Sequence, residues 1–248
     1  MQTAIDSASV DAERRFFALM AVAALIVVFG GFASSYYLWP VTQAARYPTG
    51  RPMSPSLPRI VHVHALIFSA WVALFVVQAG LVTANRVRQH RQLGAAGGVF
   101  VLGMIVTGLL TAVQGARDGW NPGGPYRDAL SFMFVGVADL AVFASTTAAA
   151  LYWRSRPEWH RRLMVLGTVG GLMWPAITRM PTIAGRPPLM FGLLALLVLA
   201  PAVRDLLVWS RSRWLTLAVA LAILSTFPLR VAVANGAAWR VVAEWVIR

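Results

Sequence analysis

Seven long apolar runs divide the chain, and a short polar segment separates each from the next. Runs of this length predict membrane-spanning helices, because about 20 apolar residues are needed to cross the hydrocarbon core of a bilayer. The expected fold class is an all-α integral membrane protein, a bundle of about seven transmembrane helices forming one polytopic domain over residues 1–248. The predicted spans are residues 16–38, 61–84, 95–114, 129–153, 163–180, 188–209 and 214–234.

The polar segments between and after the runs differ in character. The segment Pro40–Arg59 carries five prolines, and proline at this density predicts an extended loop. The last twelve residues, 237–248, predict an amphipathic helix, because Arg240, Glu244 and Arg248 fall four residues apart on one helical face. We expect this helix to lie along the membrane interface, with two tryptophans at headgroup depth, Trp239 and Trp245.

Two of the connecting loops carry the same short pattern of histidine and arginine. His90-Arg91 lies between spans two and three, and His160-Arg161 lies between spans four and five. Because an offset of two spans preserves orientation, the pattern predicts a parallel internal repeat with its axis along the membrane normal. Each loop leads into a small-xxx-small pattern that predicts close helix packing. These patterns are Gly94-x-x-x-Gly98 and Gly167-x-x-x-Gly171.

Positive charge lies on both sides of the predicted spans, with a small bias. The side that holds the N-terminus and both histidine loops carries 12 arginines, and the opposite side carries 10. Arginines in short loops mark the cytoplasmic side, so we expect a cytoplasmic N-terminus. Because the arginines sit between apolar spans, the net charge of +13 indicates contact with the lipid bilayer and its anionic headgroups rather than with nucleic acid.

The composition excludes several kinds of chemistry. All 22 basic residues are arginine, and a retinal Schiff base needs a lysine amine. The chain has no cysteine, which excludes disulfides, iron–sulfur clusters and thiolate metal sites. A metal site would therefore use the four histidines, the methionines or oxygen ligands. The chain also has no Gly-x-Ser-x-Gly elbow, so a soluble-type serine hydrolase is not expected, and enzymatic activity is left open.

His62 and His64 open the second predicted span and are candidate metal or cofactor ligands. Residues two apart on a helix point about 200° away from each other, so the pair could hold one metal ion only on extended backbone before Ala65. In the alternative interpretation, one histidine faces the bundle and the other faces solvent. A haem on this side would need a methionine as its second ligand, from among Met53, Met180 and Met190.

His90 and His160 are expected at matching depths on the cytoplasmic side. Two histidines facing each other across helices are what a bis-histidyl haem b needs, since axial nitrogen atoms hold its iron. Neighbouring arginines could contact haem propionates, or they could bind lipid headgroups and set the topology without any cofactor. The arginines concerned are Arg86, Arg91, Arg161 and Arg162.

Asp139 lies near the middle of the fourth predicted span. An acidic residue at that depth costs about 2.5–3.5 kcal/mol on insertion scales, so it should face the bundle, a cavity or a polar partner. We weigh a proton relay, ion site or substrate contact against a structural aspartate hydrogen-bonded to Gln78. Pro175 and Pro201 interrupt two later spans and could mark a binding cavity, although proline is also common in membrane helices.

The motifs together resemble a family of bacterial multi-pass inner-membrane proteins, and the resemblance covers most of the first five spans. It implies a helical inner-membrane protein with recurrent His, Gln and Arg positions, and it implies no particular reaction. There is a looser resemblance to four-histidine b-type cytochromes and to small proteins that assist haem-copper oxidase assembly. The chain departs from the cytochromes because its histidines do not lie two and two inside apposed spans. The pattern is His62-x-His64-Ala65-x-x-Phe68-x-x-Trp71-x-x-x-Phe75-x-x-Gln78-x-x-Leu81-Val82, then Arg86 and His90-Arg91-x-Leu93-Gly94.

Three functional hypotheses follow. The first is a haem- or metal-binding membrane protein with an electron-transfer or assembly role, using the four histidines. The second is a transporter or small-molecule-binding bundle centred on Asp139. The third is a structural, lipid-interacting protein without a cofactor.

Overall fold

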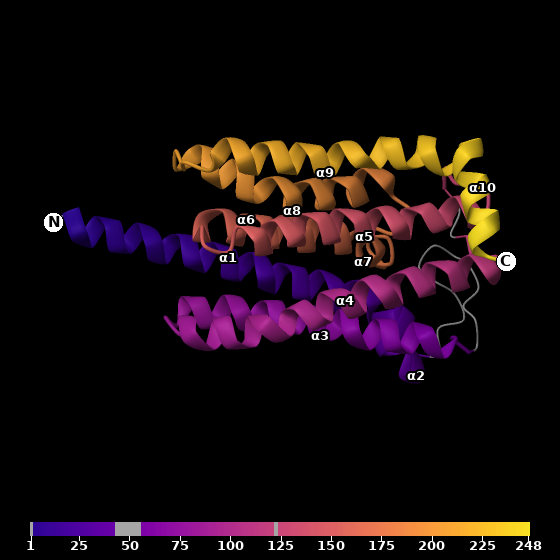
Figure 1. Cartoon of the computed structure of the whole chain (residues 1–248), viewed down its shortest axis with the longest axis horizontal. Coiled ribbons are helices and arrows are strands. Elements are labelled where there is room, and N and C mark those ends of the chain that lie inside the picture. The colour runs from indigo at the N-terminus through magenta and orange to yellow at the C-terminus, as the bar shows by residue number, and fades with distance from the viewer. Residues whose placement is uncertain (1, 43–55, 122–123) are drawn as a thin grey trace.

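The structure is a computed structural model that describes residues 2–42, 56–121 and 124–248. Within these residues the chain forms helices and the turns that join them, with no strand (Figure 1). In chain order the elements are α1 (Gln2–Phe32), the π-helix η1 (Ala33–Tyr37), α2 (Trp39–Thr42), α3 (Arg59–Thr83), α4 (Val87–Arg117), α5 (Ala129–Tyr152), α6 (Pro157–Leu172), α7 (Trp174–Ile177), α8 (Pro187–Leu207), α9 (Arg213–Ala234) and α10 (Ala237–Val246).

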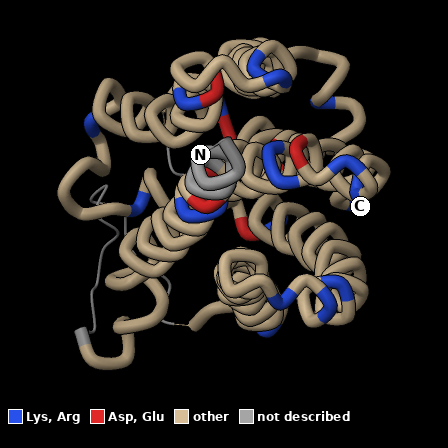
Figure 2. The backbone as a smooth tube through the Cα atoms, turned by 90° about the vertical axis from the view of Figure 1, so that its left-hand side faces the viewer, with Lys and Arg blue, Asp and Glu red and all other residues tan. Residues whose placement is uncertain are grey.

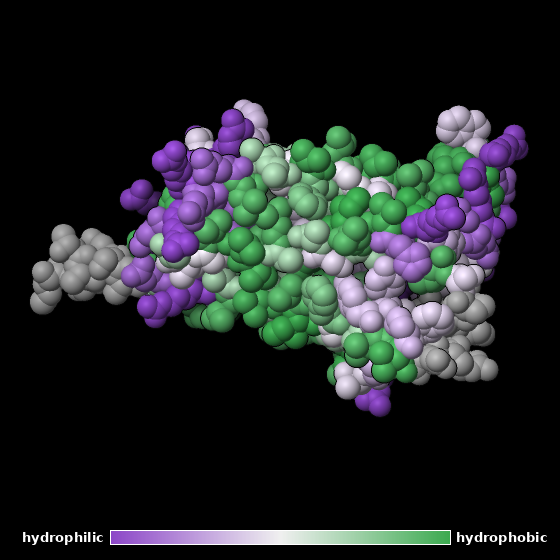
Figure 3. Space-filling model, turned by 90° about the horizontal axis from the view of Figure 1, so that it is seen from below, coloured by the Kyte–Doolittle hydropathy of each residue, from purple (hydrophilic) through white to green (hydrophobic). Residues whose placement is uncertain are grey.

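Six helical segments in the described part of the chain are long and apolar enough to cross a membrane. On the face seen in Figure 3, a hydrophobic belt covers the middle of the molecule and hydrophilic residues gather at both of its ends. The prediction of an all-helical, membrane-type fold is therefore confirmed. The six segments are Val10–Val41, Arg59–Thr83, Val87–Arg117, Ala129–Tyr152, Pro187–Leu207 and Arg213–Ala234.

The predicted span 163–180 is the one that does not form a single continuous helix in the structure. Helix α6 ends at Leu172, and the short α7 follows with Pro175 in its first turn. Proline lacks a backbone N–H and its ring clashes with the preceding turn, which explains why a continuous helix does not pass through this position. With α6 only 16 residues long, neither the seventh span nor the internal repeat is confirmed.

Helix α6 nevertheless lies at the centre of the bundle. It packs against α1, α5, α8 and α9, and every residue from Val165 to Leu172 is buried. The start of α1 and the α3–α4, α5–α6 and α8–α9 turns lie at one end of the bundle, here called the N-terminal end, and α10 crosses the other (Figure 1). Seen from the N-terminal end, acidic and basic segments lie side by side near the middle (Figure 2).

The predicted close packing holds at Gly171 of α6 and fails at Gly98 of α4. A Cβ on Gly171 would lie 2.7 Å from the Phe143 backbone nitrogen, and one on Gly170 would lie 2.6 Å from the Ile223 side chain. A Cβ on Gly98 would have nothing within 4 Å. Helix α4 lies at the side of the bundle and contacts α3 and α5, which leaves Gly98 without a close neighbour.

The C-terminal segment forms the amphipathic helix that its pattern predicts. Helix α10 crosses the end of the bundle (Figure 1), and its buried Ala243 packs against Met133. Trp239 Nε1 donates a hydrogen bond to the Leu130 carbonyl at 2.9 Å, which fixes α10 on α5. The predicted loop Pro40–Arg59 falls largely outside the described residues, and α2 extends the helical backbone past its first proline.

Candidate functional site

His90 and His160 come together at the N-terminal end of the bundle. Each lies in the first turn of its helix, α4 or α6, and their ring centroids are 6.2 Å apart with the ring planes at 78°. Both side chains are half-buried. The two loops with the shared pattern thus bring one histidine each to a common site.

The Ala150 backbone fixes which ring nitrogen of His160 carries a proton. Nδ1 of His160 lies 2.9 Å from the Ala150 carbonyl oxygen, which can only accept a hydrogen bond. Nδ1 therefore carries a proton, and in the neutral ring the free lone pair is at Nε2. A lone pair on one ring nitrogen, with the other held by a carbonyl, is the arrangement found in metal-ligating histidines.

Gln78 of α3 orients the His90 ring through a hydrogen bond to the same ring nitrogen, Nδ1. Its amide satisfies all of its neighbours when Nε2 points toward His90 and Oε1 toward Gly94. In that orientation Nε2 donates to His90 Nδ1 at 2.7 Å and to the His90 carbonyl at 3.1 Å, while Oε1 accepts from the Gly94 N–H at 2.9 Å. His90 then carries its proton on Nε2. The predicted contact between Gln78 and Asp139 is wrong, because Gln78 belongs to the histidine site.

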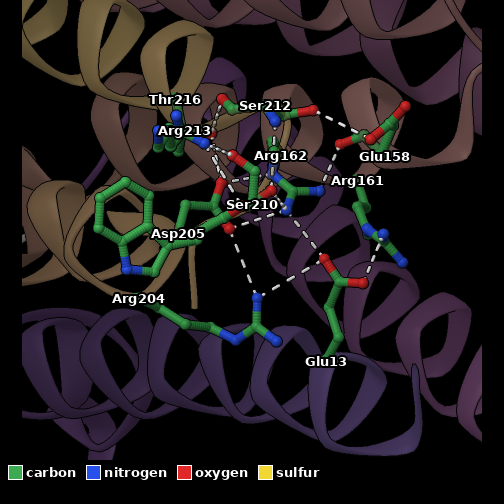
Figure 4. Close-up of polar contacts among 11 residues, drawn as sticks. Glu13, Glu158, Arg161, Arg162, Arg204, Asp205, Ser210, Ser212, Arg213 and Thr216 are labelled. Atoms are coloured by element: carbon green, nitrogen blue, oxygen red, sulfur yellow. Dashed lines mark hydrogen bonds and ion pairs between the residues drawn. The ribbon is translucent and has the colours of Figure 1, made fainter. Parts of the chain in front are cut away.

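Two of the four arginines assigned to headgroups or propionates belong instead to an internal network (Figure 4). Arg162 is 1% exposed, and its guanidinium donates hydrogen bonds of 2.5 and 2.8 Å to the carboxylate of Asp205 in α8. Arg161 pairs with Glu13 of α1 at 2.6 Å. The assignment of Arg162 to a lipid or propionate contact is therefore wrong, because its charge is already neutralised inside the bundle. The other two arginines, Arg86 and Arg91, are exposed at the same end as the histidine pair.

His62 and His64 do not form a shared site. Helix α3 begins at Arg59, so both residues are already on helical backbone, where side chains two apart diverge. His62 is exposed and its Nδ1 lies 3.1 Å from the Tyr36 hydroxyl, whereas His64 packs on Phe68 with ring centroids 4.0 Å apart. No cluster of three His, Asp or Glu residues that could hold a metal ion occurs in the described ranges.

The methionines proposed as second ligands give no support to a site on this side. Met53 lies outside the described residues, and Met180 and Met190 pack against the hydrophobic core.

Asp139 has a buried partner that the sequence analysis missed. Arg230 of α9 donates a hydrogen bond from Nη1 to Asp139 Oδ1 at 2.5 Å, and the two residues are 2% and 4% exposed. Arg230 is the one charged residue in the apolar run 214–234. Opposite charges inside two spans are expected to pair, and this signal could have identified the partner.

The two apolar grooves found in the described part of the chain do not bring Asp139 together with the two prolines. Two apolar grooves of about 600 and 520 Å³ lie along α8, one against α1 and the other against α9. Neither groove is lined by Asp139, Pro175 or Pro201. Pro201 lies buried inside α8.

Comparison with protein-family models, with curated proteins and with solved structures found no match to this chain.

Proposed function

We propose that this chain is a multi-pass inner-membrane protein that holds a metal centre between His90 and His160, as haem iron or a single transition-metal ion. The observation that carries the proposal is the 6.2 Å separation of the two ring centroids. Two imidazoles bound on opposite sides of one metal ion, each with a metal–nitrogen distance of about 2.0–2.1 Å, would have centroids roughly 6 Å apart.

The surrounding hydrogen bonds support His160 as a ligand directly, and they support His90 only after its proton moves and the Gln78 amide turns over. His160 presents its Nε2 lone pair while Ala150 holds Nδ1. His90 would need its proton moved to Nδ1, and a half-turn of the Gln78 amide would supply the carbonyl oxygen that accepts it, with loss of the amide's hydrogen bonds to the His90 carbonyl and the Gly94 N–H. Haem iron or another redox-active metal bound here would supply one-electron chemistry, which suits an electron-transfer or assembly role.

The proposal includes the arrangement of the chain in the membrane. We place the N-terminal end in the cytoplasm of a bacterium, because that end carries the larger share of arginine. Helices α6 and α7 together would form a seventh, broken membrane segment, supported by the burial of α6 among four other helices. The first-turn positions of His90 and His160 support an internal repeat of the α3–α4 and α5–α6 hairpins.

The test is a reduced-minus-oxidised absorption spectrum and a metal analysis of detergent-purified protein, expressed with ample haem and trace metals. We expect a stoichiometric centre in the wild type that is lost in His90→Ala and in His160→Ala. His62→Ala, at the other end of α3, is the matched control and should retain it. A wild-type protein without metal or haem would overturn the proposal and favour the structural, lipid-interacting hypothesis.

A second candidate function, a small-molecule-binding bundle, is favoured by one specific observation. The Asp139–Arg230 pair is a buried charge pair within the predicted spans, where ionisable residues commonly mark substrate or ion pathways. Flux or binding that is lost in Asp139→Asn, in protein that still folds, would support this function.

A further inference from the structure

Two arginines are deeply buried among the described residues, and they use their guanidinium groups differently. Arg162 applies its Nε and Nη2 edge to both oxygens of Asp205, and Nη1 donates to the Glu158 carbonyl at 2.8 Å. Arg230 contacts Asp139 through Nη1 alone. Its Nε and Nη2 are buried and have no hydrogen-bond partner among the described residues.

The unpartnered edge of Arg230 has the donor geometry that binds a carboxylate. Nε–H and Nη2–H point the same way, and this pair of donors matches the two oxygens of a carboxylate. Arg162 shows that geometry satisfied within the same molecule. A buried donor without a partner is costly, so two on one guanidinium point to an acceptor that comes from outside the chain.

The surroundings of Arg230 combine one apolar wall with a few polar groups. The centroid of the Phe227 ring lies 4.1 Å from the guanidinium carbon, and Asp139 Oδ2 is buried with no hydrogen-bond partner in the described part of the chain. Tyr126, from the loop before α5, interacts electrostatically with both Arg230 and Asp139. Burial raises the pKa of the Tyr126 phenol above its usual value, so at neutral pH it remains an O–H donor.

An apolar groove adjoins this position. It has a volume of about 520 Å³, lies between α8 and α9, and shares Phe227 with the Arg230 site. The remaining lining residues are Pro125, Phe191, Ala195, Leu224, Pro228 and Val231. All of them are apolar, which suits a hydrocarbon chain rather than a polar solute.

We propose that the Nε and Nη2 edge of Arg230 binds the carboxylate of a monocarboxylic acid, whose hydrocarbon part lies in the groove between α8 and α9. A carboxylate fits better than a phosphate dianion, because Arg230 is the only cation contacting Asp139 among the described residues and is already shared with it. The acid could come from the bilayer, as a fatty acid, or from water, as a short-chain acid. This inference is independent of the histidine pair.

The experiment measures binding of radiolabelled palmitate and of radiolabelled acetate to the full chain in nanodiscs of zwitterionic lipid. Arg230→Lys keeps a positive charge beside Asp139 but removes the two-donor edge. We expect it to weaken binding of the carboxylate by at least tenfold. Arg213→Lys makes the same change at the opposite end of α9 and should bind as the wild type does. Ala195→Phe fills the groove and should abolish palmitate binding.

A comparison on wild-type protein keeps the test decisive if Arg230→Lys does not fold. Palmitate should displace bound label, and hexadecanol, which has the same chain without the carboxylate, should not. Saturable binding of palmitate would identify the ligand as a fatty acid from the bilayer. Saturable binding of acetate alone would identify it as a short-chain acid from water. Equal displacement by the acid and the alcohol, unchanged affinity in Arg230→Lys, or no saturable binding of either acid would overturn the proposal.

Discussion

Arg162 holds Asp205 through both of its carboxylate oxygens, with Nε to Oδ2 at 2.5 Å and Nη2 to Oδ1 at 2.8 Å. The carboxylate is fully buried, and Thr216 Oγ1 donates a further hydrogen bond to Oδ2 at 2.6 Å. Glu13 adds a second carboxylate acceptor for Arg162 at 2.9 Å. One guanidinium therefore ties α6 to α1 and α8, and its acceptor Asp205 ties α8 to α9.

Replacing Asp205 by Asn should destabilise the protein strongly. Removing one partner of a buried ion pair costs about 3–5 kcal/mol, and we expect the lower end, about 3 kcal/mol, because Glu13 still faces Arg162. Unfolding of the detergent-solubilised protein by denaturant measures the change. Glu244→Gln removes a solvent-exposed ion pair on α10 and is the control. Equal stability of the two variants would contradict a structural role for the buried pair.

Asp139→Asn should also destabilise the protein, and neutralising Arg230 as well should restore much of the loss. The single change leaves a buried guanidinium without its counter-ion, a cost of about 3–5 kcal/mol. Asp139→Asn with Arg230→Met removes both charges, so the double variant should be more stable than Asp139→Asn alone. A double-mutant cycle of unfolding free energies measures this coupling. Strictly additive effects would show that the two charges do not stabilise each other.

The sequence alone was sufficient to predict the features that depend on a single helix. Length and hydropathy predicted the long spans, and the position of Asp139 in an apolar run indicated a polar partner inside the bundle. Arg230 was recognisable as a candidate partner because it is the one charged residue in its apolar run, but it lies 91 residues away, and only the packing of α5 against α9 brings it to Asp139. Gln78 faces His90 rather than Asp139 for the same reason. Proline explains the break after α6, which a hydropathy average over the run does not register.

The two glycines Gly171 and Gly98 should respond oppositely to replacement by alanine. In Gly171→Ala the new Cβ would lie 2.7 Å from the Phe143 backbone and 2.9 Å from the Asp139 carbonyl, so α5 and α6 must separate. Overpacking of this kind costs about 1–3 kcal/mol or more. Gly98→Ala meets no neighbouring atom and should be neutral or stabilising by up to about 1 kcal/mol, because alanine favours helix. Thermal unfolding of both variants checks the contrast, and a tolerated Gly171→Ala would contradict the packing.

Gln78→Leu should weaken metal binding at the histidine pair without unfolding the protein. The Gln78 amide is 2.7 Å from His90 Nδ1, and loss of such an outer partner typically lowers metal affinity about 10–100-fold. Competition with a chelator of known affinity measures the change. Gln114→Leu, on an exposed face of α4, alters an amide that hydrogen-bonds Asp118 and should leave the affinity unchanged. An unchanged affinity in Gln78→Leu would mean that His90 is oriented by other contacts.

The capping residue of α5 should make stability depend on pH in acid. Asp128 Oδ1 accepts a hydrogen bond from the Ser131 N–H at 2.8 Å, and Oδ2 accepts one from Arg240 at 2.6 Å. These contacts, the Ser131 bond foremost, lower the pKa of the Asp128 carboxyl below its usual 3.8.

Because the folded-state pKa is the lower one, this stabilisation is fully present above the unfolded-state pKa. It is lost as the pH falls through the folded-state pKa. Asp128→Asn keeps a capping side chain without a titrating charge. The wild type should therefore be more stable than Asp128→Asn near pH 6, and the difference should shrink below about pH 4, where the unfolded carboxyl begins to protonate. Midpoints of thermal unfolding at a series of pH values measure the difference. A difference that stays constant, or grows, down to the lowest pH at which the protein folds would show that Asp128 is not stabilised as a carboxylate.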